Sequence, residues 1–126
     1  MLSTTTASTT PHYSTLVASH QRLHHLRHLS SIAGWDQAAN MPPKGNEARA
    51  AALSELAGLM HGLRTDPALK THIEAAAQEN LDDLQRANLR EIEREWRMAN
   101  ALPSALVQRR QLATSKCEHA WRRQRP

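Results

Sequence analysis

Four histidines within ten residues are the part of the sequence best suited to chemistry. They occur in the stretch HQRLHHLRHL as His20, His24, His25 and His28. Spacings of four residues place His20, His24 and His28 on one face of a helix, about 40° apart from one to the next. Two imidazoles four residues apart are an element of zinc sites, in which a third ligand and a glutamate base complete the centre.

The sequence around this histidine row favours a polar helix face over a metal site. No H-E-x-x-H motif occurs in the 126 residues, so the row lacks the glutamate base of a zinc hydrolase. Arg22 and Arg27 flank the row, and a bound dication would add to this positive charge. The apolar residues Leu23, Leu26 and Leu29 define a different side of the helix. We therefore interpret the row as a polar face and predict no metal ligand in the chain.

No other arrangement in the sequence suits catalysis or cofactor binding. Cys117 and His119 are two residues apart, and such residues point to different sides of a helix, so they cannot form a nucleophile–base pair. The four glycines occur singly, which excludes the glycine-rich phosphate loops of nucleotide-binding proteins. We therefore predict no catalytic and no cofactor-binding residue, and we expect Cys117 to be a packed structural side chain.

The composition predicts an all-α fold. With 126 residues, the chain has the length of one domain or of a piece of a larger one. It contains no Phe and 3% aromatic residues, and its apolar residues are mostly Ala and Leu, which favour helices. The single cysteine excludes an intramolecular disulfide and fits a cytoplasmic location. Since no apolar run is long enough for a transmembrane helix, we expect no membrane partner.

Apolar spacing and helix breakers predict four to five antiparallel helices. They cover residues 13 to about 33, 46–63, 67–78 and 81–101, and Pro103 opens the last one. Gly34 is expected to end the first helix, and GWDQAANMPPKGN to form a loop. Asp66 is expected to cap the third helix, with Pro67 in its first position. The last helix is expected to pack through its apolar residues, which are Leu106, Val107, Ala113, Cys117, Ala120 and Trp121.

The two ends of the chain differ from its helical middle. Residues 1–12 are predicted to be a disordered tail rich in Ser and Thr, residues 13–121 the helical segment, and residues 122–126 a basic tail. The net charge is +4 and the isoelectric point about 10.0, but most basic residues are interleaved with acidic ones. Nucleic-acid binding is therefore the least favoured function, because it needs basic residues clustered on one face.

The stretch WDQAANMPPKGNEAR, from Trp35 to Arg49, carries a family signature. Four further matches follow in order: His61 with Thr65, NLREIEREW at 88–96, LPSALV at 102–107, and Ala120 with Trp121. Together these matches resemble the carboxypeptidase Taq family of metallocarboxypeptidases over nearly the whole chain. The residues of the family motif that are given a structural role are Trp35, Asp36, Gln37, Met41, Pro42, Arg49, Pro103 and Trp121.

We expect the motif residues to hold the turn between the first two helices. Trp35 is predicted to pack its ring at the corner, and Trp121 to be a packing anchor. Asp36 can accept hydrogen bonds from backbone N–H groups, and Arg49 can pair with a carboxylate. Met41 and the proline after it are expected to lead the chain into the second helix.

The resemblance implies a much longer all-helical enzyme, in which a divalent metal such as zinc or cobalt cleaves single residues from peptide C-termini. In the family the metal ligands lie on an H-E-x-x-H helix and on a later glutamate, and this sequence contains no such motif. The chain is therefore predicted to be the N-terminal segment of a metal-dependent carboxypeptidase. It is expected to have no metal, cofactor or catalytic site of its own and to be inactive alone, with peptide substrates only for the full-length parent.

The resemblance also carries an expectation about partners. A segment of a larger fold exposes the apolar surface that the rest would cover, so we expect self-association, most simply as a homodimer. The alternative function is a free-standing helical module that binds a protein partner through its exposed helix faces. Restoration of activity by the missing catalytic segment would distinguish the first function from the second.

Overall fold

Residues 9–124, which the computed structural model describes, form five α-helices. These are α1 (Pro11–Ala39), α2 (Asn46–Arg64), α3 (Pro67–Ala76), α4 (Asp83–Asn100) and α5 (Ser104–Arg123). No strand occurs among the described residues, so the all-α prediction is confirmed. None of these five helices is both long enough and apolar enough to cross a membrane.

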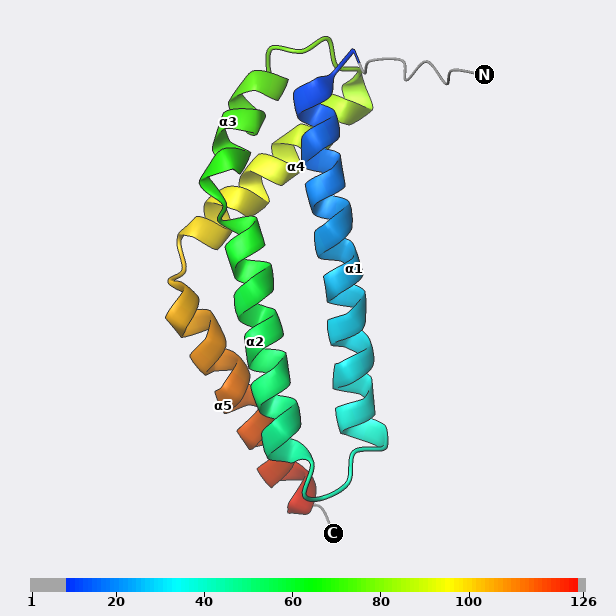
Figure 1. Cartoon of the computed structure of the whole chain (residues 1–126), viewed down its shortest axis with the longest axis vertical. Helices are drawn as coiled ribbons and strands as arrows, with labels where there is room; N and C mark the ends of the chain where they lie inside the picture. Colours follow the sequence, from blue (N-terminus) through cyan, green and yellow to red (C-terminus); the bar gives the residue numbers. More distant parts are fainter. Residues whose placement is uncertain (1–8, 125–126) are drawn as a thin grey trace, which may run out of the picture.

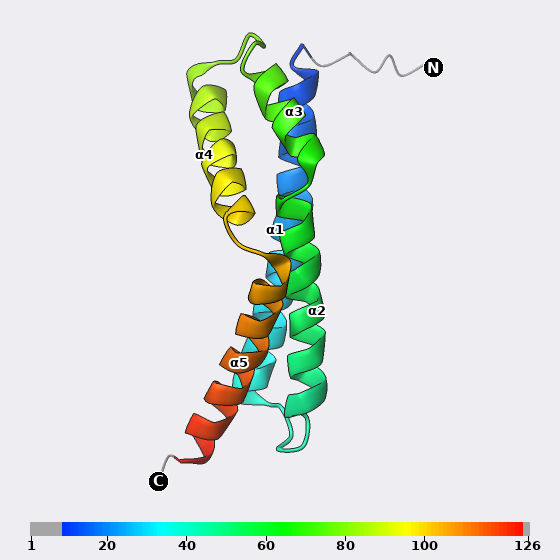
Figure 2. The ribbon, with the colours of Figure 1, turned by 90° about the vertical axis from the view of Figure 1, so that its left-hand side faces the viewer.

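The helices form three long limbs of an elongated molecule (Figure 1). The first limb is α1. The second limb consists of α2, which runs beside α1 in the opposite direction, and of α3, which continues from α2. The third limb runs back, with α4 beside α3 and α5 along α2 (Figure 2). The predicted antiparallel arrangement is therefore present between neighbouring limbs, but not between α2 and α3 or between α4 and α5, which continue in one direction. Helix α1 is long enough to span both halves of the molecule.

The apolar core lies at the end of the molecule where α1 begins. It joins the first half of α1 to α3, to the connection after α3 and to α4. Burial of each Leu or Ile side chain contributes about 1.5–3 kcal/mol to the stability of the fold. Tyr13 and Trp96 are partly buried against it. The residues of this core cluster are Leu16, Leu69, Ile73, Ala76, Leu81, Leu89 and Ile92.

The start of α1 is capped by a residue distant in sequence. The carboxylate of Glu79 accepts hydrogen bonds from the backbone N–H groups of His12 (2.8 Å) and Tyr13 (3.0 Å). Thr10, which precedes the helix, makes no side-chain cap bond. Helix α1 therefore begins at Pro11, in the position that suits proline. The predicted tail over residues 1–12 is too long at this end, and residues 1–8 lie outside the described part of the chain.

The starts of α3 and α4 carry local caps. Asp66 accepts a hydrogen bond from the N–H of Ala68 at 2.9 Å, and Pro67 is the first residue of α3, as predicted. Asp82 and Gln85 exchange two hydrogen bonds, at 2.8 and 3.0 Å, which is a complete capping box at the start of α4. Local sequence therefore sets these two boundaries.

The prediction that Gly34 ends the first helix is wrong. Helix α1 continues to Ala39, and its last turn closes with hydrogen bonds from Asn40 and Met41 to the carbonyl of Asp36. A glycine inside a helix costs only about 1 kcal/mol relative to alanine, and contacts with α2 hold the turns beyond it. The chain leaves the helix where Pro42 and a second proline follow, since a residue before proline disfavours the helical conformation.

Helix α5 packs through the opposite side from the one predicted. Ser115 is 1% exposed, while Gln108, Gln111 and Arg122 are partly buried on the same side, towards α2. Small residues of α2 permit this close approach, because a Cβ on Gly58 would meet the side chain of Gln108. Of the apolar residues expected to pack, only Val107 is partly buried. We name the exposed remainder the outer stripe of α5; it comprises Leu106, Ala113, Cys117, Ala120 and Trp121.

The end of α5 also differs from the prediction. The helix continues to Arg123, so the first residues of the predicted basic tail are helical. Arg122 donates a hydrogen bond to the backbone carbonyl of Gln37 at the end of α1. Residues 125 and 126 lie outside the described part of the chain.

Candidate functional site

The motif residues Asp36 and Arg49 form an ion pair that joins the end of α1 to the start of α2. The guanidinium Nη2 of Arg49 lies 2.6 Å from the Oδ2 of Asp36. Its Nη1 donates a hydrogen bond of 2.8 Å to the carbonyl of Ala33. The prediction that Arg49 finds a carboxylate partner is therefore confirmed. The carboxylate of Asp36 was predicted to accept hydrogen bonds from backbone N–H groups, but it pairs with the guanidinium of Arg49 instead.

Gln37 connects three helices at the same corner. Its residue is 5% exposed, its side-chain amide lies 3.4 Å from the Oδ1 of Asn46 at the start of α2, and its carbonyl accepts the bond from Arg122 of α5. Met41 and Pro42 lead into α2, as predicted, and the N–H of Gly45 closes the turn on the Pro42 carbonyl at 2.8 Å. The motif is thus a polar corner that fixes the angle between two long helices.

The other motif residues lie apart from this corner or face solvent. Pro103 directly precedes α5, and its carbonyl accepts a 3.0 Å hydrogen bond from the N–H of Leu106. Trp35 is 64% exposed and Trp121 is 54% exposed. The predictions that these two rings are packed are therefore wrong for this chain, since more than half of each residue is exposed.

The histidine row is a largely solvated surface of α1. The Nδ1 of His20 lies 3.0 Å from the carbonyl of Leu16, and His24, His25 and His28 are exposed. Across residues 9–124, no group of three or more His, Cys, Asp or Glu side chains is placed to hold a metal ion.

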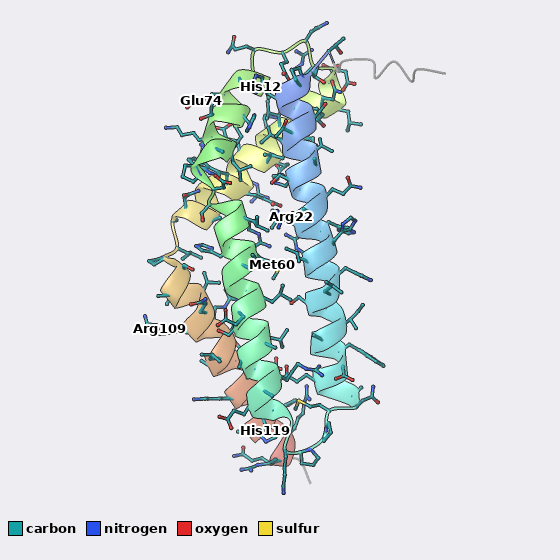
Figure 3. The ribbon with its side chains drawn as sticks, viewed as in Figure 1. His12, Arg22, Met60, Glu74, Arg109 and His119 are labelled. Carbon is teal, nitrogen blue, oxygen red and sulfur yellow. The ribbon has the colours of Figure 1, made fainter. Side chains whose placement is uncertain are left out.

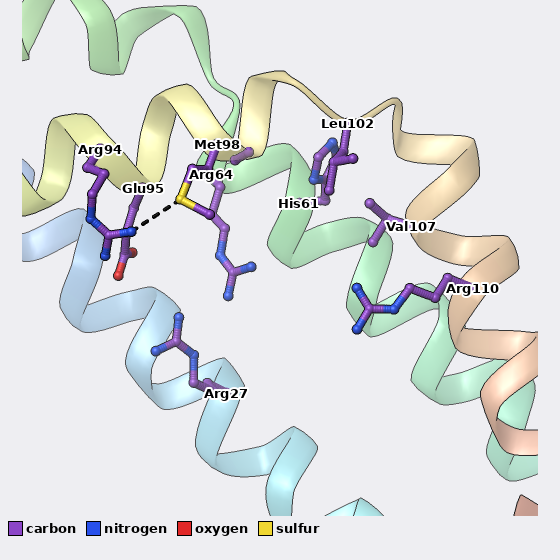
Figure 4. Close-up of a pocket in the computed structure, with 10 residues that line it drawn as sticks. Arg27, His61, Arg64, Arg94, Glu95, Met98, Leu102, Val107 and Arg110 are labelled. Atoms are coloured by element: carbon purple, nitrogen blue, oxygen red, sulfur yellow. Dashed lines mark hydrogen bonds between the residues drawn. The ribbon is translucent and has the colours of Figure 1, made fainter.

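A cavity of about 390 Å³ lies where α1, α2, α4 and α5 meet, and the sequence alone did not reveal it. Arginines from four helices line it, together with His61, Glu95 and a wall of apolar side chains. The guanidinium groups of Arg27 and Arg64 point towards one another, and that of Arg110 points towards the same space (Figure 4). The lining residues are Arg27, His61, Arg64, Arg94, Glu95, Met98, Ala99, Leu102, Val107 and Arg110.

The guanidinium of Arg64 is partly removed from water in this cavity. Burial lowers the pKa of its guanidinium, the nearby charge of Arg27 lowers the pKa further, and Glu95 partly opposes both effects. An arginine remains protonated at neutral pH even so. The cavity therefore contains a cation that has lost part of its hydration beside a second cation, which is an environment that favours an anion.

Comparisons with known proteins identify the family. The model of the carboxypeptidase Taq (M32) metallopeptidases matches residues 15–126. Thermostable carboxypeptidase 1 of Pyrococcus furiosus is 33% identical over 107 residues, which cover 84% of this chain and 21% of the relative. Thermostable carboxypeptidase 1 of Thermus thermophilus is 32% identical over 119 residues, which cover 90% of this chain and 23% of the relative.

The similarity covers most of this chain but only a small part of each relative. No solved structure matches the chain, and the chain spans less than a quarter of the length of the two curated relatives. The family model nevertheless covers nearly all of the sequence, including the polar corner of Asp36, Gln37 and Arg49. The chain therefore belongs to the carboxypeptidase Taq (M32) family of metallopeptidases.

Proposed function

We propose that this chain is the N-terminal helical portion of a metal-dependent carboxypeptidase and that it is inactive alone. The observation that carries the proposal is the family match over residues 15–126, in a chain that spans about a fifth of each relative. Metal-dependent hydrolysis needs a ligand set and a base, and the H-E-x-x-H motif is absent from the sequence. The portion would contribute structure, while the rest of the parent would contribute catalysis.

The physical contribution of this portion is a rigid wall. The polar corner joins α1, α2 and α5 through the Arg49–Asp36 ion pair and the bonds to Gln37. The apolar core fixes the opposite end. A wall held at both ends is suited to lining a peptide groove in the parent, where residues released from peptide C-termini would be the products.

The outer stripe of α5 supports an association surface on this wall. The stripe runs along most of the helix and is exposed, with Leu106 at 43% and Trp121 at 54%. Monomeric proteins rarely leave a continuous apolar patch uncovered. In this chain by itself we propose that a second copy covers the stripe, which gives a homodimer in the cytoplasm. The free-standing interaction module would use the same stripe for a different protein.

Peptidase assays of separate and combined segments test the proposed function. The 126-residue chain with added zinc or cobalt is expected to release no C-terminal residue from an N-terminally blocked peptide. The segment of the Thermus thermophilus enzyme that lies outside its match to this chain is the second component, and mixing the two is expected to restore release. Release by the chain alone would contradict the predicted inactivity.

Two controls separate assembly from catalysis in that assay. Arg49→Ala in this chain should weaken the restoration, because the polar corner is lost, while Arg109→Ala on the exposed side of α5 should not (Figure 3). If the two segments form a complex without activity, the wall function fails and the interaction module is favoured.

A further inference from the structure

We propose that the arginine-lined cavity between α1, α2, α4 and α5 binds a small organic oxyanion, with a phosphate or carboxylate head and a short apolar part. Neither the family match nor the proposed wall function assigns a ligand to it. The cavity, of about 390 Å³, has the size of small-molecule sites.

The balance of charge around the cavity calls for an anion. Arg94 is already paired, since its Nε and Nη2 both lie 2.8 Å from the Oε2 of Glu91. Among the ion pairs of residues 9–124, none includes Arg27, Arg64 or Arg110. The only carboxylate in the lining is that of Glu95. Three guanidinium groups outside the ion pairs, against one carboxylate, leave an excess of two positive charges, which a phosphate dianion would neutralise and a carboxylate would reduce to one.

Hydrogen bonding points to the same ligand. The Nε of Arg64 is buried and has no hydrogen-bond partner among the described residues. Arginine binds phosphate and carboxylate through several N–H groups at once. An oxyanion between Arg27, Arg64 and Arg110 would accept hydrogen bonds from the guanidinium groups that point into the cavity and would supply the missing charge.

The remaining wall of the cavity selects for an apolar part of the ligand. Met98, Ala99, Leu102 and Val107 line it, and they come from the end of α4, the connection after it and the start of α5 (Figure 4). A ligand that carries a small ring or alkyl group next to its anionic head would contact this wall. We therefore expect phenyl phosphate to bind more tightly than inorganic phosphate.

Calorimetric titration of the full chain tests the site. The probes are inorganic phosphate, phenyl phosphate and phenylacetate, each at constant ionic strength with chloride as the reference salt. Saturable binding is expected, tightest for one of the two phenyl compounds, and the comparison of these two distinguishes a phosphate head from a carboxylate head. Absence of saturable binding of all three probes would overturn the proposal.

Arginine variants distinguish binding at the cavity from a general attraction of anions to a positively charged protein. Arg64→Met and Arg110→Met should each weaken binding by about tenfold or more, since each removes charge-assisted hydrogen bonds. Arg109→Met is the matched control, because Arg109 is the sequence neighbour of Arg110, changes the net charge equally and projects from the outer side of α5 (Figure 3). Equal losses in the Arg109 and Arg110 variants would overturn the proposal, since they would indicate diffuse attraction.

Thermal unfolding provides a second readout that does not depend on a tight complex. Phenyl phosphate should raise the melting temperature of the unsubstituted chain. Without ligand, Arg64→Met should melt at or above the temperature of the unsubstituted chain, because a buried cation beside Arg27 is removed, and its melting temperature should no longer respond to phenyl phosphate. An unchanged response of this variant would contradict the assignment of Arg64 to the site.

Discussion

At the scale of single residues, polar side chains far apart in sequence fix the two ends of α1. Glu79 caps its start, and Arg49 holds its last turns through Asp36 and the Ala33 carbonyl. The sequence predicted that Arg49 has a carboxylate partner, because the family motif brings an acid and an arginine to one turn. It did not predict the role of Glu79, because 66 and 67 residues separate Glu79 from the N–H groups that it accepts.

Removal of the Glu79 carboxylate should lower the stability of the chain. Glu79→Ala is expected to cost about 1–2 kcal/mol in the free energy of unfolding, because two N–H groups at the start of α1 lose their acceptor. Glu79→Gln keeps one acceptor oxygen and should cost less. Urea unfolding followed by circular dichroism measures both. Glu74→Ala is the control, since Glu74 is exposed and only 3.9 Å from Lys70 in a weak pair; an equal loss there would contradict the capping role.

The arginine cavity shows why part of the candidate site could not be predicted at this scale. Arg27, Arg64, Arg94 and Arg110 are far apart from one another in the sequence and lie on four different helices. Periodicity identifies residues that share a face of one helix, but not faces of different helices that meet. Only the packing of α1, α2, α4 and α5 brings the four side chains to one space.

At the scale of elements, helix ends with strong local signals were predicted correctly. Asp66 with Pro67, and Pro103, mark the starts of α3 and α5 because capping oxygens and proline act within one turn. Gly34 misled the prediction because its intrinsic cost is small and contacts with α2 exceed it. The side of α5 that packs against α2 could not be predicted either. Its apolar residues share one face in the sequence pattern, and this pattern is the same whether the face is covered or exposed.

Replacement of Gly34 by alanine should stabilise α1. A Cβ at this position would meet nothing within 4 Å, so the gain in helix propensity, about 0.5–1 kcal/mol, should appear without strain. Thermal or urea unfolding measures the gain. Gly45→Ala is the matched control, because its Cβ would lie 3.1 Å from the Cγ of Met41 and 3.2 Å from the Pro42 carbonyl oxygen. A loss of stability in the Gly34 variant would contradict the description of α1 as one continuous helix.

At the scale of the whole molecule, apolar side chains are divided between one buried cluster and an exposed surface. The core lies around α1, α3 and α4, while the outer stripe of α5 is uncovered. The proposed role as one portion of a larger enzyme would account for this division, since the matched segment spans about a fifth of each relative. Self-association of the chain is the expected consequence.

A charge on the outer stripe should break the predicted homodimer. Size-exclusion chromatography with light scattering should give twice the chain mass of 14.1 kDa, and Leu106→Asp or Trp121→Asp should give the mass of one chain. Leu84→Asp on α4 is the control, because Leu84 is 80% exposed and lies outside the stripe. A monomer before any substitution would contradict the prediction, and dissociation of the Leu84 variant would show that the stripe is not the contact.

Because the apolar core lies at one end of the molecule, we expect the two ends to unfold locally with different ease. Apolar burial protects the amides around Leu16 and Ile92, whereas ion pairs and single hydrogen bonds hold the corner of Asp36 and Arg49. Screening by salt weakens the second group of contacts more than the first. We expect amide hydrogen exchange to be faster at the corner and to accelerate there when salt is added. Uniform exchange along α1 would show instead that this long helix opens as one cooperative unit.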